Sequence, residues 1–430
     1  MSEVGINEVF PYKVCINLDR RRARWQQMQL KFERSGIHSV HRFSGFDGEN
    51  LPLPAHWAHT PGAYGCLLSH LQVVREARRL GMVSVLIFED DVVFDDHFEQ
   101  KFDACSSELP HDWDMLFFGA LHKDEPIKVS SNIARITQAN STYACALNAR
   151  VYDDFIEVNS NTDEVLDNNS LILQRRFNSY CFMPHLAWVE ADHSDAQRRW
   201  VDHWYLRESL VLFGPEVDRL LRETTIVFAH SDRIGVDGAP DNLLYLVHYY
   251  DRYFGPFVQM VIVDQGGAPT IDPSTLPSNC KYLFRRDEGP FDRERCFLDG
   301  IGQSETSRNV FILCDSDIYL ETLDIRANLR MCERYDCATG FGRIVELTAE
   351  DSVRLRNART TQWIDIMIQA SPGTGGEGYC LFLTRAAIQI LLAGAGGDGV
   401  GSLLSPRAKQ IRVFQSPNSG LRLQPARTRL

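Results

Sequence analysis

The sequence lacks a hydrophobic run long enough to cross a bilayer. Its longest apolar stretches, residues 83–88 and 386–394, are short or interrupted by polar residues, which is typical of buried core elements. Met1-Ser2-Glu3 opens with an acid and no apolar stretch follows, so a secretory signal is not expected. The sequence therefore predicts a cytoplasmic protein without an integral membrane segment, and it leaves open a peripheral contact at the inner face of a membrane.

The sequence also lacks an excess of basic residues and any CxxC cysteine pair. Its 45 Lys and Arg are outnumbered by 57 Asp and Glu, which gives a net charge of −12. Because nucleic-acid-binding domains normally present a basic face, no nucleic-acid partner is expected. Of the 11 cysteines, Cys15, Cys145 and Cys314 lie in apolar, strand-like segments. We therefore expect reduced, buried thiols rather than a disulfide framework.

The length of 430 residues exceeds what one hydrophobic core usually covers, so two domains are expected. The apolar segments that favour strands are residues 12–18, 83–88, 115–119, 223–230, 258–264 and 309–315. The amphipathic segments that favour helices are residues 21–35, 65–79 and 241–254. This alternation is typical of mainly parallel sheets covered on both faces. We predict an α/β fold in two tandem units, residues 1–220 and 221–430, with a loosely ordered stretch after Gly394.

The first acidic cluster, Glu89-Asp90-Asp91, follows the apolar strand at residues 83–88. In open α/β sheets, ligands bind at the carboxyl ends of strands. Carboxylates at such an end can face one cation, and Mg²⁺ or Mn²⁺ often shares oxygen ligands with substrate phosphates. A bound cation would neutralise the charge that develops on a departing diphosphate. Taken alone, these three acids are more typical of a solvated turn.

Basic and polar motifs accompany this cluster. Arg20-Arg21-Arg22 and Arg24 lie where the first strand gives way to a helix, and guanidinium groups beside free helix N–H groups suit a diphosphate. The turn Gly45-Phe46-Asp47-Gly48 follows, and after it comes the segment from Gly62 to His70, which enters the predicted helix at residues 65–79. Alone, an Arg run is more often a solvated helix face, and a lone histidine is more often a hydrogen-bonded core residue. Their combination and order favour a shared functional site.

This combination resembles glycosyltransferase family 25, the lipopolysaccharide and procollagen galactosyltransferase group, over roughly residues 12–200. The resemblance rests on INLDRRRARW, the FDG turn, GCLLSH, the strand leading to EDDV, and a later segment from Thr162-Asp163 through Tyr180 and Pro184 to Ser194-Asp195. It implies a GT-A fold, a UDP-sugar donor with galactose favoured, Mn²⁺ or Mg²⁺, inversion at the transferred sugar, and a glycan or glycolipid acceptor.

By position, the resemblance implies roles for individual residues. The residues expected to contact the nucleotide or diphosphate are Asn17, Asp19, Arg20 and Arg24. Those expected to shape the donor pocket are Asp47, Ser69 and His70, and those expected to hold the metal are Glu89, Asp90 and Asp91. An inverting transfer also needs a carboxylate base on the acceptor hydroxyl. Asp163 and Asp167 are the candidates, and either could instead cap a helix.

A second acidic motif, Asp315-Ser316-Asp317, follows the strand at residues 309–315. This half resembles a family 2 type glycosyltransferase domain over roughly residues 223–400. The resemblance implies metal ligands at Asp315 and Asp317. It implies donor contacts at Ala229, His230, Asp232, Asp264 and Arg293. The paired Glu-Asp that often supplies the base in that family is missing after Gly396-Gly397-Asp398, and Glu377 or Asp398 could substitute.

The sequence therefore predicts a metal-dependent glycosyltransferase of surface polysaccharide or lipopolysaccharide-type synthesis, with one or both units active. The missing Glu-Asp pair favours a version in which the second unit only binds a glycan or a nucleotide sugar. A metal-dependent phosphohydrolase is the third interpretation, since the same carboxylates could bind Mg²⁺ to cleave a nucleotide diphosphate. Such hydrolases commonly group more acidic or histidine ligands in one site, and the Arg-rich helix and GCLLSH better suit a donor-sugar pocket.

Overall fold

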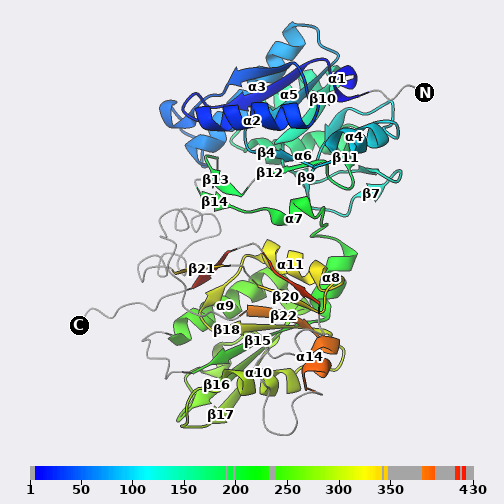
Figure 1. The fold of residues 1–430 in the computed structure, drawn as a ribbon. Helices are drawn as coiled ribbons and strands as arrows, with labels where there is room; N and C mark the ends of the chain where they lie inside the picture. Colours follow the sequence, from blue (N-terminus) through cyan, green and yellow to red (C-terminus); the bar gives the residue numbers. More distant parts are fainter. Residues whose placement is uncertain are drawn as a thin grey trace. The chain divides into compact units, whose positions relative to one another are not determined.

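The computed structural model describes residues 5–189, 191–196, 199–231, 239–340, 343–346, 380–392, 412–416 and 419–422 (Figure 1). The chain divides into two compact units, Met1–Gly214 and Pro215–Leu430. The predicted boundary after residue 220 falls inside helix α8 (Pro215–Arg222). Because α8 buries Val217, Leu220 and Leu221 in the core of the second unit, the division comes before this helix.

The first unit is built on an eight-stranded sheet with the order β2-β1-β3-β10-β5-β11-β8-β7. Its strands are β1 (Lys13–Asn17), β2 (Val40–Ser44), β3 (Ser84–Glu89), β5 (Met115–Phe117), β7 (Ile127–Lys128), β8 (Ile133–Arg135), β10 (Ala144–Asn148) and β11 (Ser179–Phe182). Three small two-stranded sheets join β4 (Val92–Phe94) to β12 (Ala187–Val189), β6 (Leu121–His122) to β9 (Ala139–Asn140), and β13 (Asp192–Ser194) to β14 (Arg199–Val201). The helices are α1 (Ile6–Val9), α2 (Arg22–Arg34), α3 (Pro61–Arg79), α4 (Phe98–Ser106), α5 (Tyr152–Ser160), α6 (Leu166–Arg176) and α7 (Trp204–Arg207), with short 3₁₀ turns η1 (Gly48–Asn50) and η2 (Ala149–Val151).

The prediction of a mainly parallel sheet holds in part for this unit, where β5 and β11 also form a parallel pair. Strands β2, β1 and β3 are parallel, as predicted, and α2 and α3 provide the crossovers. Strand β10 then inserts antiparallel between β3 and β5, and β8 and β7 add further antiparallel pairs. The prediction rested on the alternation of strands and helices, which is typical of parallel strands. An antiparallel strand needs no helical crossover, so this alternation could not predict the direction of β10. The sheet is therefore mixed, with parallel and antiparallel strand pairs, and the fold of the unit is α/β.

Local sequence explains the boundaries of the elements that carry the site. Helix α3 begins with Thr60, whose hydroxyl accepts the Ala63 N–H, and Pro61 occupies the first helical position. Helix α2 is followed by Gly36 at φ 65°, a left-handed conformation that glycine adopts without steric cost. Residues of β3 alternate between two buried faces. Val85 and Ile87 join the cluster of α3 and α5, whereas Phe88 packs on Phe32, Phe94 and Phe118.

The second unit is built on a seven-stranded sheet with the order β17-β16-β15-β18-β22-β20-β23, and a three-stranded sheet has the order β19-β24-β21. The strands are β15 (Thr224–His230), β16 (Gln259–Gly266), β17 (Cys280–Arg286), β18 (Val310–Asp315), β19 (Ile318–Tyr319), β20 (Cys337–Thr339), β21 (Arg343–Glu346), β22 (Cys380–Thr384), β23 (Val413–Phe414) and β24 (Ser419–Arg422). The described helices are α8, α9 (Ala239–Phe254), α10 (Arg293–Gly302), α11 (Thr322–Met331) and α14 (Arg385–Leu392), with short 3₁₀ turns η4 (Gly255–Phe257) and η5 (Pro273–Thr275). Strands β17, β16, β15 and β18 are parallel, and β22 lies antiparallel to β18.

Two general expectations have structural outcomes. All 11 cysteines are unpaired, and all are buried except Cys66 and Cys280, which are partly exposed, so the prediction of reduced thiols that are largely buried is confirmed. Across the described ranges, none of the helices combines the length and apolar character that a membrane span requires. The stretch after Gly394 that was predicted to be loosely ordered lies largely outside the described residues.

Candidate functional site

The ends of β1 and β3 bring the first set of predicted residues together. The two strands are parallel and in register, with Ile16 opposite Glu89, so Asn17 and Glu89 end their strands at the same sheet edge. A cavity of about 90 Å³ lies there. Its lining includes predicted residues from five segments, namely Arg20, Arg24, Asp47, Ser69, His70, Glu89, Asp90 and Asp91. The carboxyl edge of a sheet is where ligands of α/β proteins bind.

Asp90 is held by two side chains that follow β1. The Asn17 amide donates to Asp90 Oδ2 at 2.6 Å, and Arg24 Nη1 lies 2.9 Å from Asp90 Oδ1. Arg24 projects from the first turn of α2 and also lies 3.9 Å from Asp91. Hydrogen bonds between a guanidinium and a carboxylate are charge-assisted, so this contact is stronger than one between neutral groups. Asp90 is therefore an anchor for Arg24 in this structure rather than a carboxylate open to a metal.

The other arginines of the predicted diphosphate site contact an acidic segment around β13. Arg21 forms a two-point ion pair with Asp195, at 3.0 and 2.8 Å, and Arg20 reaches the same carboxylate at 3.1 Å. Arg24 pairs with Asp192 at 2.8 Å. A Cβ at Gly62 would lie 2.0 Å from the carbonyl oxygen of Asp195, so glycine is what lets this segment reach the pocket. Carboxylates thus occupy the arginine faces that a diphosphate would use.

Glu89 faces α3 rather than the arginines. Its Oε1 lies 3.6 Å from His70 Nε2 and 3.9 Å from Cys66 Sγ. Cys66 and His70 are four residues apart on one helix face, and the three ligand atoms lie within 4.8 Å of one another. The Nδ1 atom of His70 donates to the Cys66 carbonyl at 3.1 Å, since a carbonyl only accepts, and this leaves the neutral ring with a bare Nε2 toward Glu89. Burial lowers the pKa of His70 to about 4.

The donor set at this edge fits a divalent cation. Asp91 Oδ1 is buried and has no hydrogen-bond partner among the described residues. Burial, offset in part by Arg24, raises the pKa of Asp91 to about 6. Burial and the neighbouring acids Asp91, Asp167 and Asp90 raise the pKa of Glu89 well above its usual range. Carboxylates that are costly to ionise in a buried site are stabilised by a bound metal ion.

The remaining predicted pocket residues have structural partners. Asp47 caps η1 and accepts from Arg20 at 2.7 Å. The Ser69 hydroxyl donates to the Gly65 carbonyl and accepts the Phe46 N–H at 2.8 Å, which fixes the FDG turn against α3. Asp19 lies outside the cavity lining and accepts from Arg42 and Ser44 at the exposed edge of the sheet. The structure therefore brings Asp47 and Ser69 to the pocket and leaves Asp19 at its margin.

The two candidates for the catalytic base have different surroundings. Asp167, at the start of α6, accepts the Ser141 N–H at 3.2 Å, and burial raises its pKa. It contributes to the raised pKa of Glu89, so its carboxylate lies within electrostatic reach of the pocket. Asp163 is exposed on the loop before α6. Geometry and electrostatics favour Asp167 over Asp163.

The sequence analysis missed three contributors to this site. Cys66 could have been found from its four-residue spacing to His70 within GCLLSH. Asp192 carries no local signal, because its role depends on a hairpin with β14 that brings it to Arg24. Arg42 of β2 donates to Asn17 Oδ1 at 2.9 Å and to Asp19 at 2.6 Å, and only the pairing of β2 with β1 reveals that contact.

In the second unit, β15 and β18 bring the predicted DxD motif to a strand end as well. Ala229 of β15 is opposite Asp315 of β18, and the His230 ring lies 3.0 Å from the Ser316 hydroxyl through Nδ1. Arg293, the first residue of α10, forms an ion pair with Asp315 at 2.9 Å. Asp317, the other acid of the motif, is partly exposed.

The Asp264 carboxylate is held mainly by hydrogen bonds from neighbouring residues of the second unit. One of its oxygens accepts from the Thr270 backbone, the Thr270 hydroxyl and the Tyr282 hydroxyl, at 2.6 to 2.9 Å. This network joins β16 to β17 through one carboxylate oxygen, Oδ2. The other oxygen, Oδ1, is buried and has no partner among the described residues. Asp232, Glu377 and Asp398 lie outside the described residues.

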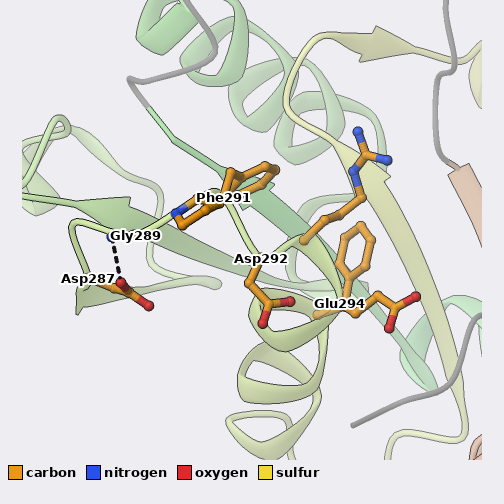
Figure 2. Close-up of a pocket in the computed structure, with 8 residues that line it drawn as sticks. Asp287, Gly289, Phe291, Asp292 and Glu294 are labelled. Atoms are coloured by element: carbon orange, nitrogen blue, oxygen red, sulfur yellow. Dashed lines mark hydrogen bonds between the residues drawn. The ribbon is translucent and has the colours of Figure 1, made fainter.

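A cavity of about 620 Å³ lies at the start of α10 (Figure 2). Figure 2 shows Phe291 on one side of it and the carboxylates of Asp292 and Glu294 on another, with Asp287 bonded to the Gly289 N–H. The Asp292 side chain caps α10 by accepting the Arg295 N–H at 2.9 Å. Arg293 also lines this cavity, and its ion pair with Asp315 links the cavity to the DxD motif.

Comparison with known proteins identifies the family to which the first site corresponds. Residues 11–144 match the family model of glycosyltransferase family 25 (LPS biosynthesis protein). A glycosyltransferase 25 family member of Drosophila melanogaster is 28% identical over 162 residues, which cover 33% of this chain and 26% of that protein. The inactive glycosyltransferase 25 family member 3 of Homo sapiens is 33% identical over 135 residues, which cover 27% of this chain and 22% of that protein.

Residues 11–144 therefore match a glycosyltransferase family 25 domain, and the predicted resemblance is confirmed for these residues. The matches span about a quarter of the length of the relatives. The resemblance of the second unit to family 2 remains a prediction. Among solved structures, the glycosyltransferase GlyE of Streptococcus pneumoniae TIGR4 aligns at 9% identity and a TM-score of 0.26, covering 67% of this chain and 83% of that chain. A similarity of this size carries no functional argument.

Proposed function

We propose that the first unit is a metal-dependent glycosyltransferase that uses a nucleotide diphosphate sugar. One observation supports this most strongly. The segment that matches family 25 contains the end of β1, the start of α2, helix α3 and the end of β3, and these elements supply most of the lining of one cavity. That cavity holds buried carboxylates beside guanidinium groups, which are the groups that hold a cation and a diphosphate.

In this proposal, Asp91 and Glu89 hold Mn²⁺ or Mg²⁺, which neutralises negative charge on the diphosphate when bound. Arg20, Arg21 and Arg24 bind the phosphate oxygens after exchanging their present partners Asp195 and Asp192. Asp167 accepts the proton of the acceptor hydroxyl as the sugar is transferred with inversion. Galactose from UDP-galactose is the favoured donor sugar, and a glycan or glycolipid of surface polysaccharide or lipopolysaccharide type is the acceptor.

We also propose a role for the second unit in ligand binding. Its cavity of about 620 Å³ adjoins Arg293 and, through this arginine, Asp315. A nucleotide sugar or a glycan matches the mixture of an aromatic ring, carboxylates and a guanidinium on its walls. If Asp315 and Asp317 bind a metal there, the unit performs a second transfer and the protein is bifunctional.

The test is a panel of UDP-sugars scored for nucleotide release with Mn²⁺, Mg²⁺ or EDTA and with glycan or glycolipid acceptors. We expect one donor to be turned over in Mn²⁺ or Mg²⁺ and to be inert in EDTA. Binding of nucleotide sugars without turnover would place the protein with the relatives that are named inactive. Folded protein that binds no nucleotide sugar in any metal would overturn the proposal for the first unit.

A further inference from the structure

A second cluster of metal-ligating side chains lies in the first unit, separate from the pocket lining. It consists of His122 of β6, Cys181 of β11 and His185 on the turn after β11, and we call it the His122–Cys181–His185 cluster. Its three ligand atoms lie within 4.8 Å of one another. The side chains are 1%, 0% and 2% exposed, and no residue of the cluster lines the glycosyltransferase pocket.

The protonation state of His185 follows from its contacts. Its Nδ1 atom lies 2.8 Å from the Leu206 carbonyl oxygen, which can only accept, so Nδ1 carries the proton. Burial lowers the pKa of His185 to about 4, so the ring is neutral and its Nε2 atom is a bare electron-pair donor. A metal-bound histidine typically donates its other ring N–H to a carbonyl or carboxylate, and His185 already makes that contact.

The distance between the two rings suits a shared metal ion. His185 Nε2 lies 3.4 Å from His122 Nε2. With zinc–nitrogen bonds of about 2.0 to 2.1 Å and a tetrahedral angle, two nitrogen ligands lie about 3.3 to 3.4 Å apart. Burial lowers the pKa of His122 to about 3, so this ring is neutral as well and can ligate. The separation of the two Nε2 atoms therefore matches that of two nitrogen ligands of one zinc ion.

Cys181 supplies the third ligand and selects the kind of metal. Its thiol lies on the buried strand β11 and contacts the Phe182 carbonyl at 3.4 Å. A cation bound at this position would displace the thiol proton, because a thiol that coordinates a metal ion is deprotonated. A site of two imidazoles and one thiolate suits Zn²⁺, whereas Mg²⁺ and Mn²⁺ prefer oxygen ligands.

We propose that His122, Cys181 and His185 form a zinc site of three protein ligands, distinct from the metal site proposed for the glycosyltransferase pocket. Binding converts the Cys181 thiol to a zinc thiolate and releases one proton to solvent, and a water completes four-coordination. The ion would join the β6–β9 pair to strand β11. Through the hydrogen bond of His185 to Leu206, it would also fix α7. Its role would be to stabilise the unit.

The experiment measures zinc bound to the purified full-length protein after loading with Zn²⁺ and extensive dialysis. We expect one zinc ion per chain in the wild type. Cys181→Ser and His122→Gln should each bind zinc at least about tenfold more weakly, as loss of a ligand does. Cys105→Ser is the matched control, since Cys105 is also buried in the first unit but has no place in the cluster, and it should retain zinc.

Two outcomes would overturn the proposal. One is folded wild-type protein that retains no zinc, which would leave the two rings as a neutral hydrogen-bonded pair. The other is zinc that is lost in Cys66→Ser but retained in Cys181→Ser, which would place the ion beside Glu89 in the pocket. Should Cys181→Ser fail to fold, Co²⁺ bound to Cys66→Ser decides between the two sites, because Cys181 is then the one thiol left in the two clusters and a thiolate ligand adds a charge-transfer absorption band, whose absence contradicts the assignment.

Discussion

The two units end a buried parallel strand in acidic residues, yet they surround those residues differently. In the first unit, Asp90 and Asp91 follow β3, and Arg24 of the neighbouring helix α2 contacts both. In the second unit, Asp315 ends β18, and its arginine partner Arg293 comes from α10. Arg24 is 12% exposed and Arg293 is 36% exposed.

This difference shows that acids at a strand end do not define a donor site by themselves. The first unit adds Arg20 and Arg21, which Asp195 holds at the pocket, and it adds Glu89 and Asp91 with raised pKa values. The cavity there is about 90 Å³, and the segment Ser194-Asp195-Ala196 forms part of its lining. The second unit has a larger cavity of about 620 Å³ and a less enclosed arginine. The first unit therefore has more charged side chains at its strand end, and the second unit has the larger cavity.

The largest expected effect separates the two acidic motifs. Asp91→Asn preserves shape and removes the charge that we assign to metal binding, so turnover of the donor used by the first unit should fall by about 10²- to 10³-fold. Asp317→Asn is the matched change in the second unit and should leave that turnover unchanged. Nucleotide release measures both, and circular dichroism checks the fold. Equal losses in the two variants would show that the units do not act separately.

The next effect concerns stability rather than turnover. Arg24→Ala leaves Asp90 and Asp91 buried without their counter-charge, and we expect a loss of about 3 kcal/mol in the free energy of unfolding. Arg293→Ala removes a more exposed ion pair and should cost about 1 kcal/mol or less. Denaturant unfolding of the two variants makes the comparison. Arg24→Lys should be more stable than Arg24→Ala but less stable than the wild type, since one ammonium group cannot replace the contacts of both guanidinium nitrogens with Asp90 and Asp192.

The smallest of these effects tests whether the acidic segment competes with a diphosphate. Asp195→Asn weakens the hold on Arg20 and Arg21, so the Kd for UDP should fall by about two- to fivefold, the equivalent of a partly exposed ion pair. Asp47→Asn is the control, because it releases Arg20 alone and should change the Kd less. A Kd that rises in Asp195→Asn would indicate that Asp195 positions the arginines for the ligand.

The local part of the fold could be predicted from the sequence, because each feature has a local physical cause. Apolar runs mark β1, β3, β15 and β18, and Gly36 marks the end of α2. The mixed character of the first sheet could not be predicted in this way. Strand β10 pairs with β3 and β5, and such long-range pairing leaves no periodic signal in its five residues.

The candidate site likewise has features that follow from local sequence and contacts that depend on the long-range fold. The positions of Asn17 and Glu89 at one sheet edge follow from two parallel strands, so the sequence predicted them together. The sequence did not predict the ion pair between Arg24 and Asp90, because side-chain partners depend on packing between distant segments. The contact of Asp195 with Arg21 spans 174 positions and depends on the hairpin of β13 and β14. The His122–Cys181–His185 cluster also joins distant segments, since His122 lies far in sequence from Cys181 and His185 and only the fold brings it to them.

The central claim is that the acids after β3 form a metal-dependent nucleotide site. Calorimetric titration of UDP into wild-type protein tests it most directly, first with Mn²⁺, then with EDTA, and then with Mn²⁺ in Asp91→Asn. The account predicts binding in Mn²⁺ that weakens by at least about tenfold in EDTA and in the variant, because Asp91 would hold the cation that neutralises the charge of the diphosphate. Equal affinity for UDP in all three titrations would contradict it.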